Sequence, residues 1–298
     1  MTKITKNILI TGCNGQLGNE LRLAIEESND PNTYYYTDVA ELDITDKQAV
    51  ENYFRDNHIQ VVVNCAAYTN VDSAEDNPEI TDQINHIAVL NLAKACAQNS
   101  AMLIHISTDY VFDGTDNTPY TESAPTHPLG VYGVTKLKGE EAVVRSGCQY
   151  IILRTSWLYS AFGKNFVKTM QRLTSEKETV TVVFDQAGTP TYAPDLANVI
   201  LAFIKRADTE RAIINQTYHF SNEGVCSWYD FSVAINEAFG HHCTVLPTHS
   251  YEYPSKVTRP SYSVLDKTKI KTTLGIQIPH WKSSMMKCVN RLKSTDPL

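Results

Sequence analysis

The sequence has no long apolar run and no excess of positive charge. Its 26 Lys and Arg residues face 33 Asp and Glu residues, which gives a formal net charge of −7. Such a chain has no electrostatic reason to bind nucleic acid or an anionic membrane. No apolar run approaches the roughly 20 residues that cross a bilayer. The apolar stretch at residues 8–10 is too short for a signal peptide. We therefore expect a cytoplasmic protein with no nucleic-acid or membrane partner.

Cysteine and histidine give no sign of a disulfide framework or a metal centre. The seven cysteines are odd in number, scattered and without a C-x-x-C pair, so reduced thiols are expected in a chain of this length. His241, His242 and Cys243 adjoin one another. They have no second ligand cluster nearby, whereas a structural zinc ion takes four ligands. We assign no metal ligands.

What the sequence does contain is an alternation of short apolar runs and longer amphipathic runs. With 42% hydrophobic and 20% charged residues, the chain has the composition of an ordinary globular protein. Apolar runs without internal alternation, separated by helices, predict a parallel sheet covered on both faces, and right-handed crossovers make it a doubly wound α/β fold. In the first half we expect strands at 7–11, 34–37, 61–64, 103–107 and 150–154, and helices at 16–27, 46–56, 80–98 and 131–144.

A glycine-rich turn joins the first predicted strand to the first predicted helix. Its G-x-x-G-x-x-G spacing allows a tight turn and lets backbone N–H groups approach a pyrophosphate at the positive end of the helix. A Cβ at Gly12 or Gly15 would hold the phosphate away. Asp38 follows Gly18 by 20 residues, at the end of the second strand, where a carboxylate meets an adenosine ribose. We predict a dinucleotide site of the Rossmann type, with contacts from Gly12, Asn14, Gly15, Gln16, Leu17, Gly18 and Asp38.

The identity of the dinucleotide depends on Asp38. A carboxylate at this position favours a free 2′-hydroxyl and repels a 2′-phosphate. No arginine adjoins Asp38, and the nearest downstream positive charge is Lys47. The residues alone favour NADH or tolerance of both cofactors, so NADPH and NADH both remain open.

The second half is less regular and predicts a smaller lobe. Helices are expected at 164–175, 194–205 and 228–239, and strands at 179–184 and 218–221, with Gly/Pro/Thr-rich stretches between them. We divide the chain into a dinucleotide-binding domain at 1–160 and a C-terminal α/β substrate-binding lobe at 161–298. Some elements of the second part are expected to return to the first.

A Tyr-x-x-x-Lys pair on the predicted helix 131–144 offers acid–base chemistry. The spacing places Tyr132 and Lys136 on one helix face. An ammonium near a phenol lowers the phenol pKa from about 10 toward neutrality, so that Tyr132 could exchange a proton with a substrate oxygen. Thr108 ends the preceding strand, at the sheet edge where ligand-binding residues gather. Together these residues predict a hydride-transfer site.

Several longer segments carry a resemblance to a known family. They are residues 64–69, 71–75, 107–114, 131–136, 154–159, 165–166, 185–186 and 259–260. The chain resembles the extended short-chain dehydrogenases/reductases and, among them, the dTDP-4-dehydrorhamnose reductases. The resemblance implies hydride transfer from NADPH or NADH to C4 of dTDP-4-dehydro-L-rhamnose, giving dTDP-L-rhamnose for polysaccharide synthesis.

The resemblance also implies roles for individual residues. Tyr132 would donate the proton, Lys136 would lower its pKa and hold the ribose, and Thr108 would orient the carbonyl. The dinucleotide would further be lined by Asp43, Ile44, Ala66, Ala67, Tyr68 and Ser107, and the dTDP-sugar would contact Thr108, Asp109 and Trp157.

Two of the substrate residues have plain structural alternatives. Trp157 could instead be a core aromatic at the junction of the lobes. We add Arg259 as a ligand of the diphosphate, because a guanidinium fork matches phosphate oxygens. Its alternative is a surface salt bridge.

The family resemblance raises the question of whether this chain binds magnesium. Some members dimerise through magnesium held by acidic side chains, and Glu20 matches one such position. Pro194 and Asp195 stand where another glutamate is expected, and no third acidic ligand is evident near the C-terminus. We therefore do not expect metal-linked dimerisation, and a monomer and a homodimer both remain open.

Three other functions share this fold. A nucleotide-sugar 4,6-dehydratase would need an Asp–Glu pair after the threonine, whereas Thr108 is followed by Asp109 and Tyr110. An epimerase would need the 4-keto sugar to rotate in the site, which the sequence does not decide. A regulatory protein similar to the methionine adenosyltransferase β subunit would bind a dinucleotide without turnover. The intact Tyr132–Lys136 pair favours a working reductase.

Overall fold

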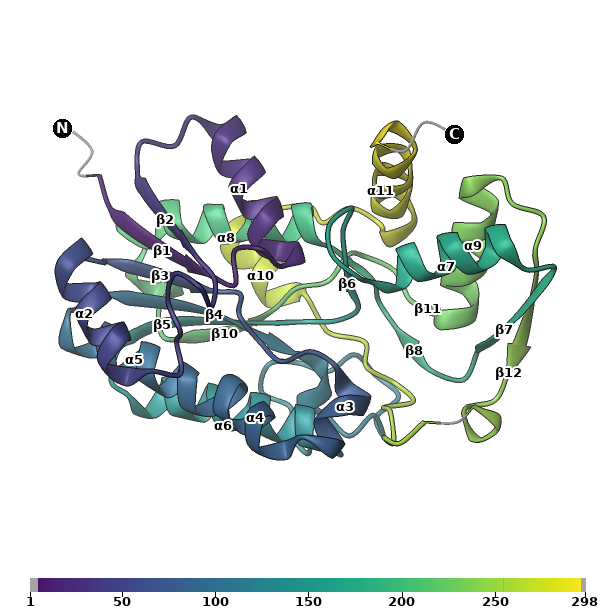
Figure 1. The fold of residues 1–298 in the computed structure, drawn as a ribbon, viewed down its shortest axis with the longest axis horizontal. Helices are drawn as coiled ribbons and strands as arrows, with labels where there is room; N and C mark the ends of the chain where they lie inside the picture. The colour runs from purple at the N-terminus through teal and green to yellow at the C-terminus, as the bar shows by residue number, and fades with distance from the viewer. Residues whose placement is uncertain (1–4, 254, 296–298) are drawn as a thin grey trace.

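The computed structural model of the chain describes residues 5–253 and 255–295. A six-stranded sheet with helices on both faces forms the larger part, and a smaller group of helices and short strands lies beside it (Figure 1). The outer ends of both predicted domains, residues 1–4 and 296–298, fall outside the described residues, as does Pro254. In the described part of the chain, no helix is both long and apolar enough to cross a membrane.

The main sheet confirms the predicted doubly wound parallel fold. Its strand order is β10-β5-β4-β3-β1-β2, and every neighbouring pair is parallel. The central strands β1 and β3 are continuous apolar runs because both faces are covered, and Ile8, Leu9 and Ile10 are fully buried. The chain turns to opposite sides of β1, which creates a switch point at its carboxyl end. The strands are β1 (Asn7–Thr11), β2 (Thr33–Thr37), β3 (Val61–Asn64), β4 (Met102–Thr108), β5 (Gln149–Thr155) and β10 (Gln216–His219).

Two helical layers sandwich this sheet, each over its own apolar cluster. The first layer is α1 (Gln16–Ser28), α8 (Ala193–Arg206) and α10 (Thr268–Leu274), and the second is α2 (Lys47–Asn57), α5 (Ala88–Gln98) and α6 (Val131–Arg145) (Figure 1). Asp46 starts α2 by accepting from the N–H groups of Gln48 and Ala49. Since β10, α8 and α10 all lie beyond residue 160, the C-terminal part of the chain contributes to the main sheet and its cover. The division at residue 160 itself stays a prediction.

The expected helix at 80–98 is interrupted by a π-helical turn. The chain forms α4 (Pro78–Asp82), the π turn η1 (Gln83–Ile87) and then α5. The turn directs Asn85 toward Tyr68, whose backbone N–H donates to the Asn85 side chain at 2.8 Å. Helix α6 packs against this turn so closely that a Cβ on Gly139 would lie 2.3 Å from the Asn85 carbonyl oxygen.

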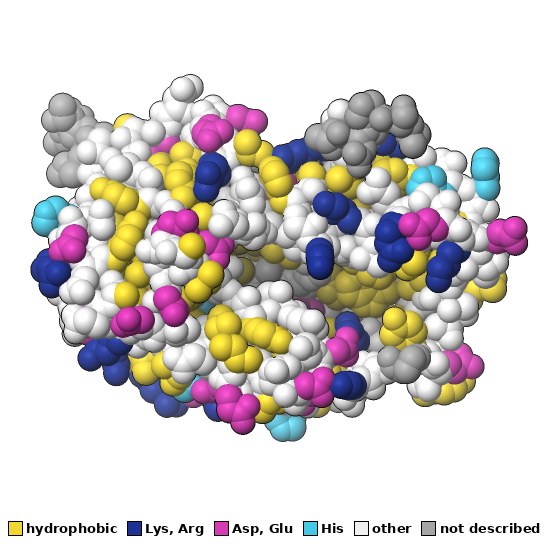
Figure 2. Space-filling view, in the orientation of Figure 1, with side chains coloured by type: hydrophobic (Ala, Val, Ile, Leu, Met, Phe, Trp, Pro, Cys, Tyr) yellow, Lys and Arg dark blue, Asp and Glu magenta, His cyan; other side chains and the backbone are white. Residues whose placement is uncertain are grey.

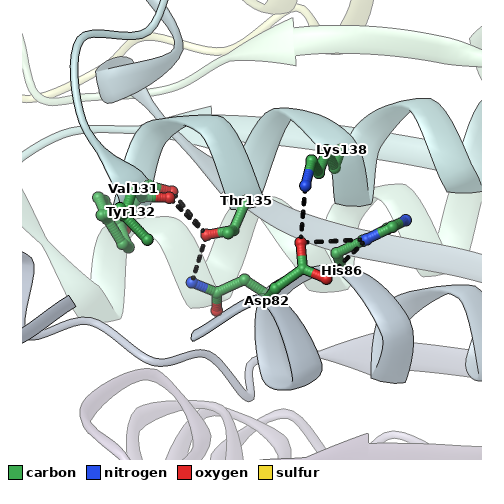
Figure 3. A network of polar contacts seen from close by, with 7 residues as sticks. Asp82, His86, Val131, Tyr132, Thr135 and Lys138 are labelled. Carbon is green, nitrogen blue, oxygen red and sulfur yellow. Dashed lines mark hydrogen bonds and ion pairs between the residues drawn. The ribbon is translucent and has the colours of Figure 1, made fainter. Parts of the chain in front are cut away.

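Polar contacts fix the two ends of this packing, as Figure 3 shows. At one end, the Asn85 side-chain amide of the π turn donates to the Thr135 hydroxyl of α6 at 3.3 Å. One helical turn further along, Lys138 pairs with Asp82 of α4 at 3.0 Å. Helix α6 is therefore held along its length, which fixes the backbone that carries Tyr132 and Lys136.

The smaller lobe is built from short elements around a third apolar cluster. Its helix α9 begins with a capping box, in which Ser227 and Asp230 bond to each other's backbone N–H groups. The short strands pair only in twos, as β6–β9, β8–β11 and β7–β12. The α-helices and strands of the smaller lobe are β6 (Leu158–Tyr159), α7 (Phe166–Glu176), β7 (Thr179–Val183), β8 (Ala187–Gly188), β9 (Thr191–Tyr192), β11 (Cys226–Ser227), α9 (Trp228–Phe239), β12 (Thr244–Thr248) and α11 (Trp281–Thr295), whereas α3 (Val71–Asp76) packs on α6 of the larger part.

Candidate functional site

A cavity of about 530 Å³ lies at the carboxyl edge of the main sheet. The surface is hollowed where the two lobes meet (Figure 2). In a doubly wound fold this edge is where ligands bind. The predicted site residues that line the cavity are Gly12, Gly15, Gln16, Leu17, Ala67, Ser107, Thr108, Asp109, Tyr132, Lys136, Trp157 and Arg259.

Other predicted residues do not line the cavity. They are Asn14, Gly18, Asp38, Asp43, Ile44, Ala66 and Tyr68. Asp43 accepts from both the backbone N–H and the hydroxyl of Thr45, and so shapes its own turn. The hydroxyl of Tyr68 donates to Ser73 of α3 at 2.8 Å.

The glycine turn has the backbone shape that a pyrophosphate cradle requires. Gly15 is the N-cap of α1 and no side chain caps the helix, so the first N–H groups of α1 lack a side-chain cap at the cavity. Gly12 has a φ of +62°, and a Cβ there would lie 2.7 Å from the Ala66 backbone nitrogen. Gly12 is thus required mainly because a side chain there would clash with the chain after β3. Room beside a phosphate is a second reason. These residues fit a dinucleotide diphosphate.

Charges of both signs stand beside the turn. The Asp38 carboxylate accepts from the Asn14 backbone N–H at 3.1 Å, which ties it to the glycine loop. Arg22 of α1 lies over the Tyr36 ring at 4.5 Å. Burial raises the pKa of the Cys13 thiol, and the Arg22 guanidinium opposes that rise. Arg22 was not predicted, because spacing along the chain does not show that this side chain of α1 lies over Tyr36 of β2.

The proposed acid–base residues converge on one wall of the cavity. Thr108 and Lys136 are almost fully buried, whereas Tyr132 is half-buried. The Thr108 hydroxyl donates to Asp109 at 3.0 Å. Tyr110, which the sequence analysis did not single out, packs its ring edge-on to Tyr132 with centroids 5.5 Å apart. This wall is therefore formed by two adjacent turns of helix α6 and by the end of strand β4 with the residues that follow it.

The expected low pKa of Tyr132 is wrong for this structure. Burial raises the pKa of the phenol far above its ordinary value, and a hydrogen bond with Thr108 opposes the rise. The Lys136 ammonium does not point at the phenol but donates to the Ile106 carbonyl oxygen at 2.6 Å. Tyr132 therefore stays protonated at neutral pH, the state that a proton donor needs.

Two other ionisable groups on this wall have shifted pKa values. Burial lowers the pKa of Lys136 to about 8, and the Glu140 carboxylate opposes that fall. Burial raises the pKa of Asp109 to about 6, against hydrogen bonds with Ser263 and Thr108. Opposite shifts in adjacent buried groups are typical of functional sites.

Trp157 forms the far wall together with a second tryptophan. Its ring stacks on Trp228 with centroids 3.6 Å apart and planes within 10°. Trp157 has a φ of +49°, which is unusual for a bulky residue. A Cβ on Gly188 would lie 2.6 Å from its ring. Trp157 therefore lines the cavity and also packs at the lobe junction. Trp228 was missed because no local pattern connects it to a site formed by distant segments.

Arg259 joins the first cavity to a second one of about 960 Å³. Its guanidinium pairs with Asp72 of α3 at 2.7 Å, and both side chains are partly exposed. Arg259 also bonds to the hydroxyl of Tyr110 and lowers its pKa against the effect of burial. Arg259 therefore forms the ion pair and also lines the cavity, and its role as a diphosphate ligand stays a prediction. Both cavities are lined by Lys164, Asn165, Trp228 and Arg259.

The acidic residues considered for magnesium have partners within the chain. Glu20 is buried, and both of its oxygens accept from Arg291, at 3.0 and 2.8 Å. One oxygen of Asp195 accepts from Asn222 and Ser284, at 2.7 and 2.6 Å. Within residues 5–253 and 255–295, no group of three or more His, Cys, Asp or Glu side chains is arranged to hold a metal ion.

Comparisons with known proteins agree on one family. The family model described as "RmlD substrate binding domain" matches residues 6–294. A dTDP-4-dehydrorhamnose reductase from Aggregatibacter actinomycetemcomitans is 38% identical over 284 residues, covering 93% of this chain and 96% of that protein. The solved structure of a dTDP-4-dehydrorhamnose reductase from Clostridium acetobutylicum has a TM-score of 0.91 at 41% identity, covering 96% of this chain and 99% of that one. The reductase from Bacillus anthracis, solved in complex with NADP, has a TM-score of 0.90 at 36% identity, covering 97% and 100%.

Proposed function

The chain belongs to the RmlD substrate binding domain family, and on this premise we propose that it is a dTDP-4-dehydrorhamnose reductase. It reduces C4 of dTDP-4-dehydro-L-rhamnose to give dTDP-L-rhamnose. The observation that carries the assignment is near-full-length similarity to such reductases in a chain whose Tyr132, Thr108 and Lys136 line one cavity. A nicotinamide dinucleotide, when bound, supplies the hydride.

The proton is proposed to come from Tyr132. Its phenol is protonated at neutral pH and half-buried in the cavity wall. As the carbonyl oxygen at C4 gains negative charge, the phenol donates its proton to it. To orient that oxygen beside Tyr132, the Thr108 hydroxyl turns its hydrogen from Asp109 to the carbonyl oxygen. Asp109 is proposed to contact a sugar hydroxyl.

The dinucleotide is proposed to bind along the glycine turn. Uncapped N–H groups at the start of α1 suit its diphosphate, and Asp38 suits an adenosine ribose. Lys136 is proposed to donate to the nicotinamide ribose, which would replace its bond to Ile106. NADPH is the proposed reductant, since a relative at 36% identity was solved with NADP, and NADH is the alternative.

The sugar nucleotide is proposed to occupy both cavities. The flat Trp157–Trp228 stack offers an apolar surface to sugar C–H groups. Beyond it, Lys164 and Arg259 line both cavities and would hold the diphosphate, for which Arg259 exchanges its partner Asp72. The second cavity then has room for the nucleoside.

We place the reaction in the cytoplasm, which suits seven free thiols. Whether the working form is a monomer or a homodimer stays open. No magnesium is assigned a role, because Glu20 and Asp195 have partners within the chain.

A coupled assay tests the function. The protein is given dTDP-4-dehydro-L-rhamnose, made in situ by a dehydratase and an epimerase, together with NADPH. We expect one NADPH to be consumed for each dTDP-L-rhamnose formed. An altered sugar without net loss of NADPH would indicate an epimerase, and dinucleotide binding without turnover would indicate a regulatory protein.

A further inference from the structure

A buried ionic cluster lies behind the wall that carries the acid–base residues. It consists of Glu140 on α6, Arg154 on β5 and Ser107 on β4, all with 6% or less of their surface exposed. Each member lies close in sequence to a proposed site residue. Glu140 follows Lys136 by one helical turn, Ser107 precedes Thr108, and Arg154 begins the segment that leads to Trp157.

The Glu140 carboxylate is the centre of this cluster. Arg154 grips it with two nitrogens, Nε to Oε1 at 2.9 Å and Nη2 to Oε2 at 2.7 Å. The Ser107 hydroxyl donates to Oε1 at 2.5 Å. One carboxylate thus connects α6 to the carboxyl ends of two adjacent strands. A fixed, bidentate geometry of this kind keeps a buried charge in one place.

The charge of Lys136 depends on its burial and on two neighbouring groups. Burial disfavours the ammonium form, whereas Glu140 and Cys65 favour it. Cys65 is neutral near pH 7, because burial raises its pKa to about 12. On the adjoining strand, burial and the Lys136 charge keep His105 neutral. Beside Arg154, His219 of β10 is likewise neutral, since burial lowers its pKa to about 3. Within this set, Glu140 is thus the acidic side chain that is paired with a cation, Arg154.

We propose that Glu140 is a positioning residue of the active site, whose buried carboxylate keeps Lys136 an ammonium ion and holds the end of β4 against α6. The effect on Lys136 is electrostatic, since a fixed negative charge one turn away offsets part of the cost of burying the ammonium. The effect on β4 is mechanical, through the bond from Ser107 to the carboxylate. The link to catalysis rests on the proposed function, in which Lys136 holds the dinucleotide ribose.

A purely structural role for Glu140 makes a different prediction. In that case the carboxylate would only compensate the buried Arg154, and its loss would destabilise the fold without a specific effect on Lys136. Removing one partner of a buried ion pair is strongly destabilising. Stability alone therefore cannot separate the two roles, whereas the titration of Lys136 can.

The test is an NMR titration of Lys136 in the ligand-free protein, labelled at the lysine Cε carbon and assigned with Lys136→Arg. In Glu140→Gln we expect the pKa of Lys136 to fall by about 1. The matched control is Glu141→Gln, which removes the same charge from the next residue, an exposed partner of Arg145. We expect no change there. An unchanged Lys136 pKa in Glu140→Gln would overturn the proposal.

A double variant keeps the test decisive if Glu140→Gln does not fold. Glu140→Gln/Arg154→Met removes both buried charges and leaves no guanidinium uncompensated. We expect the pKa of Lys136 to stay lowered in the double variant, because the carboxylate is still missing. Its return to the value in the unmodified protein would mean that the charge of Arg154 cancels that of Glu140 at Lys136, and it would overturn the electrostatic part of the proposal. Since the titration needs no substrate or dinucleotide, its outcome is independent of whether the protein reduces dTDP-4-dehydro-L-rhamnose.

Discussion

The indole rings of Trp157 and Trp228 stack face to face, with centroids 3.6 Å apart. Trp157 comes from the chain after β5 and Trp228 begins α9, so the stack joins the main sheet to the smaller lobe. Gly188 leaves room for the edge of the Trp157 ring. Trp157 is therefore fixed in the cavity wall before any substrate arrives.

Replacing Trp228 should weaken binding of the sugar nucleotide. In Trp228→Leu we expect the KM for dTDP-4-dehydro-L-rhamnose to rise by up to about tenfold, because an aromatic pair of this kind contributes about 0.5–1.5 kcal/mol. Dinucleotide affinity should not change, and near-ultraviolet circular dichroism should report loss of the stack. The neighbouring Tyr229→Leu, which lines neither cavity, is the control. An unchanged KM in Trp228→Leu would remove the stack from the substrate site.

Removing the phenol hydroxyl should abolish most of the reduction. In Tyr132→Phe we expect kcat to fall by about 10²- to 10⁴-fold, the usual contribution of a general acid. Dinucleotide affinity, measured by fluorescence titration, should stay nearly the same because the ring remains in place. If the variant kept more than about half of its activity, Tyr132 would not be the proton donor.

Dinucleotide binding should depend on pH through Lys136. Its pKa is about 8, and the charged form exists below that pH. We therefore expect dinucleotide affinity to be highest below about pH 8 and to fall as the pH rises through this value, when the ammonium loses its proton. The measurement is the dissociation constant of NADPH as a function of pH.

The control for the pH experiment is Lys136→Arg, whose guanidinium stays charged across this range. Its affinity should be lower overall but free of the decline near pH 8. Equal pH dependence in the two proteins would show that another group is responsible.

Asp38 should determine the preference between the two cofactors. In Asp38→Ala we expect the KM ratio to shift toward NADPH, because the carboxylate repels a 2′-phosphate and favours a 2′-hydroxyl. Arg22, on the adjacent helix, leaves positive charge near the loop once the carboxylate is gone. Glu41→Gln is the matched control, since Glu41 bonds to the backbone of Asp38 and not to the glycine loop. A preference that is the same in Asp38→Ala and in the unmodified protein would refute this role of Asp38.

Elements with strong local signals could be predicted from the sequence. Strands β1 and β3 and helix α9 have the predicted bounds, because each is set by its own apolar pattern and flanking turn residues. The parallel direction of the strands could be predicted from the alternation of such elements. The short strands β8 and β9 were missed, since two residues carry no periodicity and their pairing depends on tertiary packing. The π turn η1 was missed for a similar reason, because Asn85 and the contact at Gly139 require the neighbouring helix.

The candidate site divides in the same way. The cavity residues in contiguous motifs, such as the glycine turn and the Tyr132–Lys136 pair, could be found from spacing alone. Trp228 and Tyr110 could not, because their contacts come from segments far apart in the chain or from side-chain packing. The pKa of Tyr132 was predicted in the wrong direction because spacing shows that Lys136 shares its helix face but not that its ammonium bonds to Ile106.

The most direct measurement is the fate of deuterium from NADPH that carries deuterium at both C4 positions of its nicotinamide ring. The protein is given this reductant with dTDP-4-dehydro-L-rhamnose, and the product is analysed by NMR and mass spectrometry. We predict dTDP-L-rhamnose carrying one deuterium at C4 of the sugar, at a rate that falls sharply in Tyr132→Phe. A product without deuterium at C4, or no product while NADPH remains bound, would contradict the account.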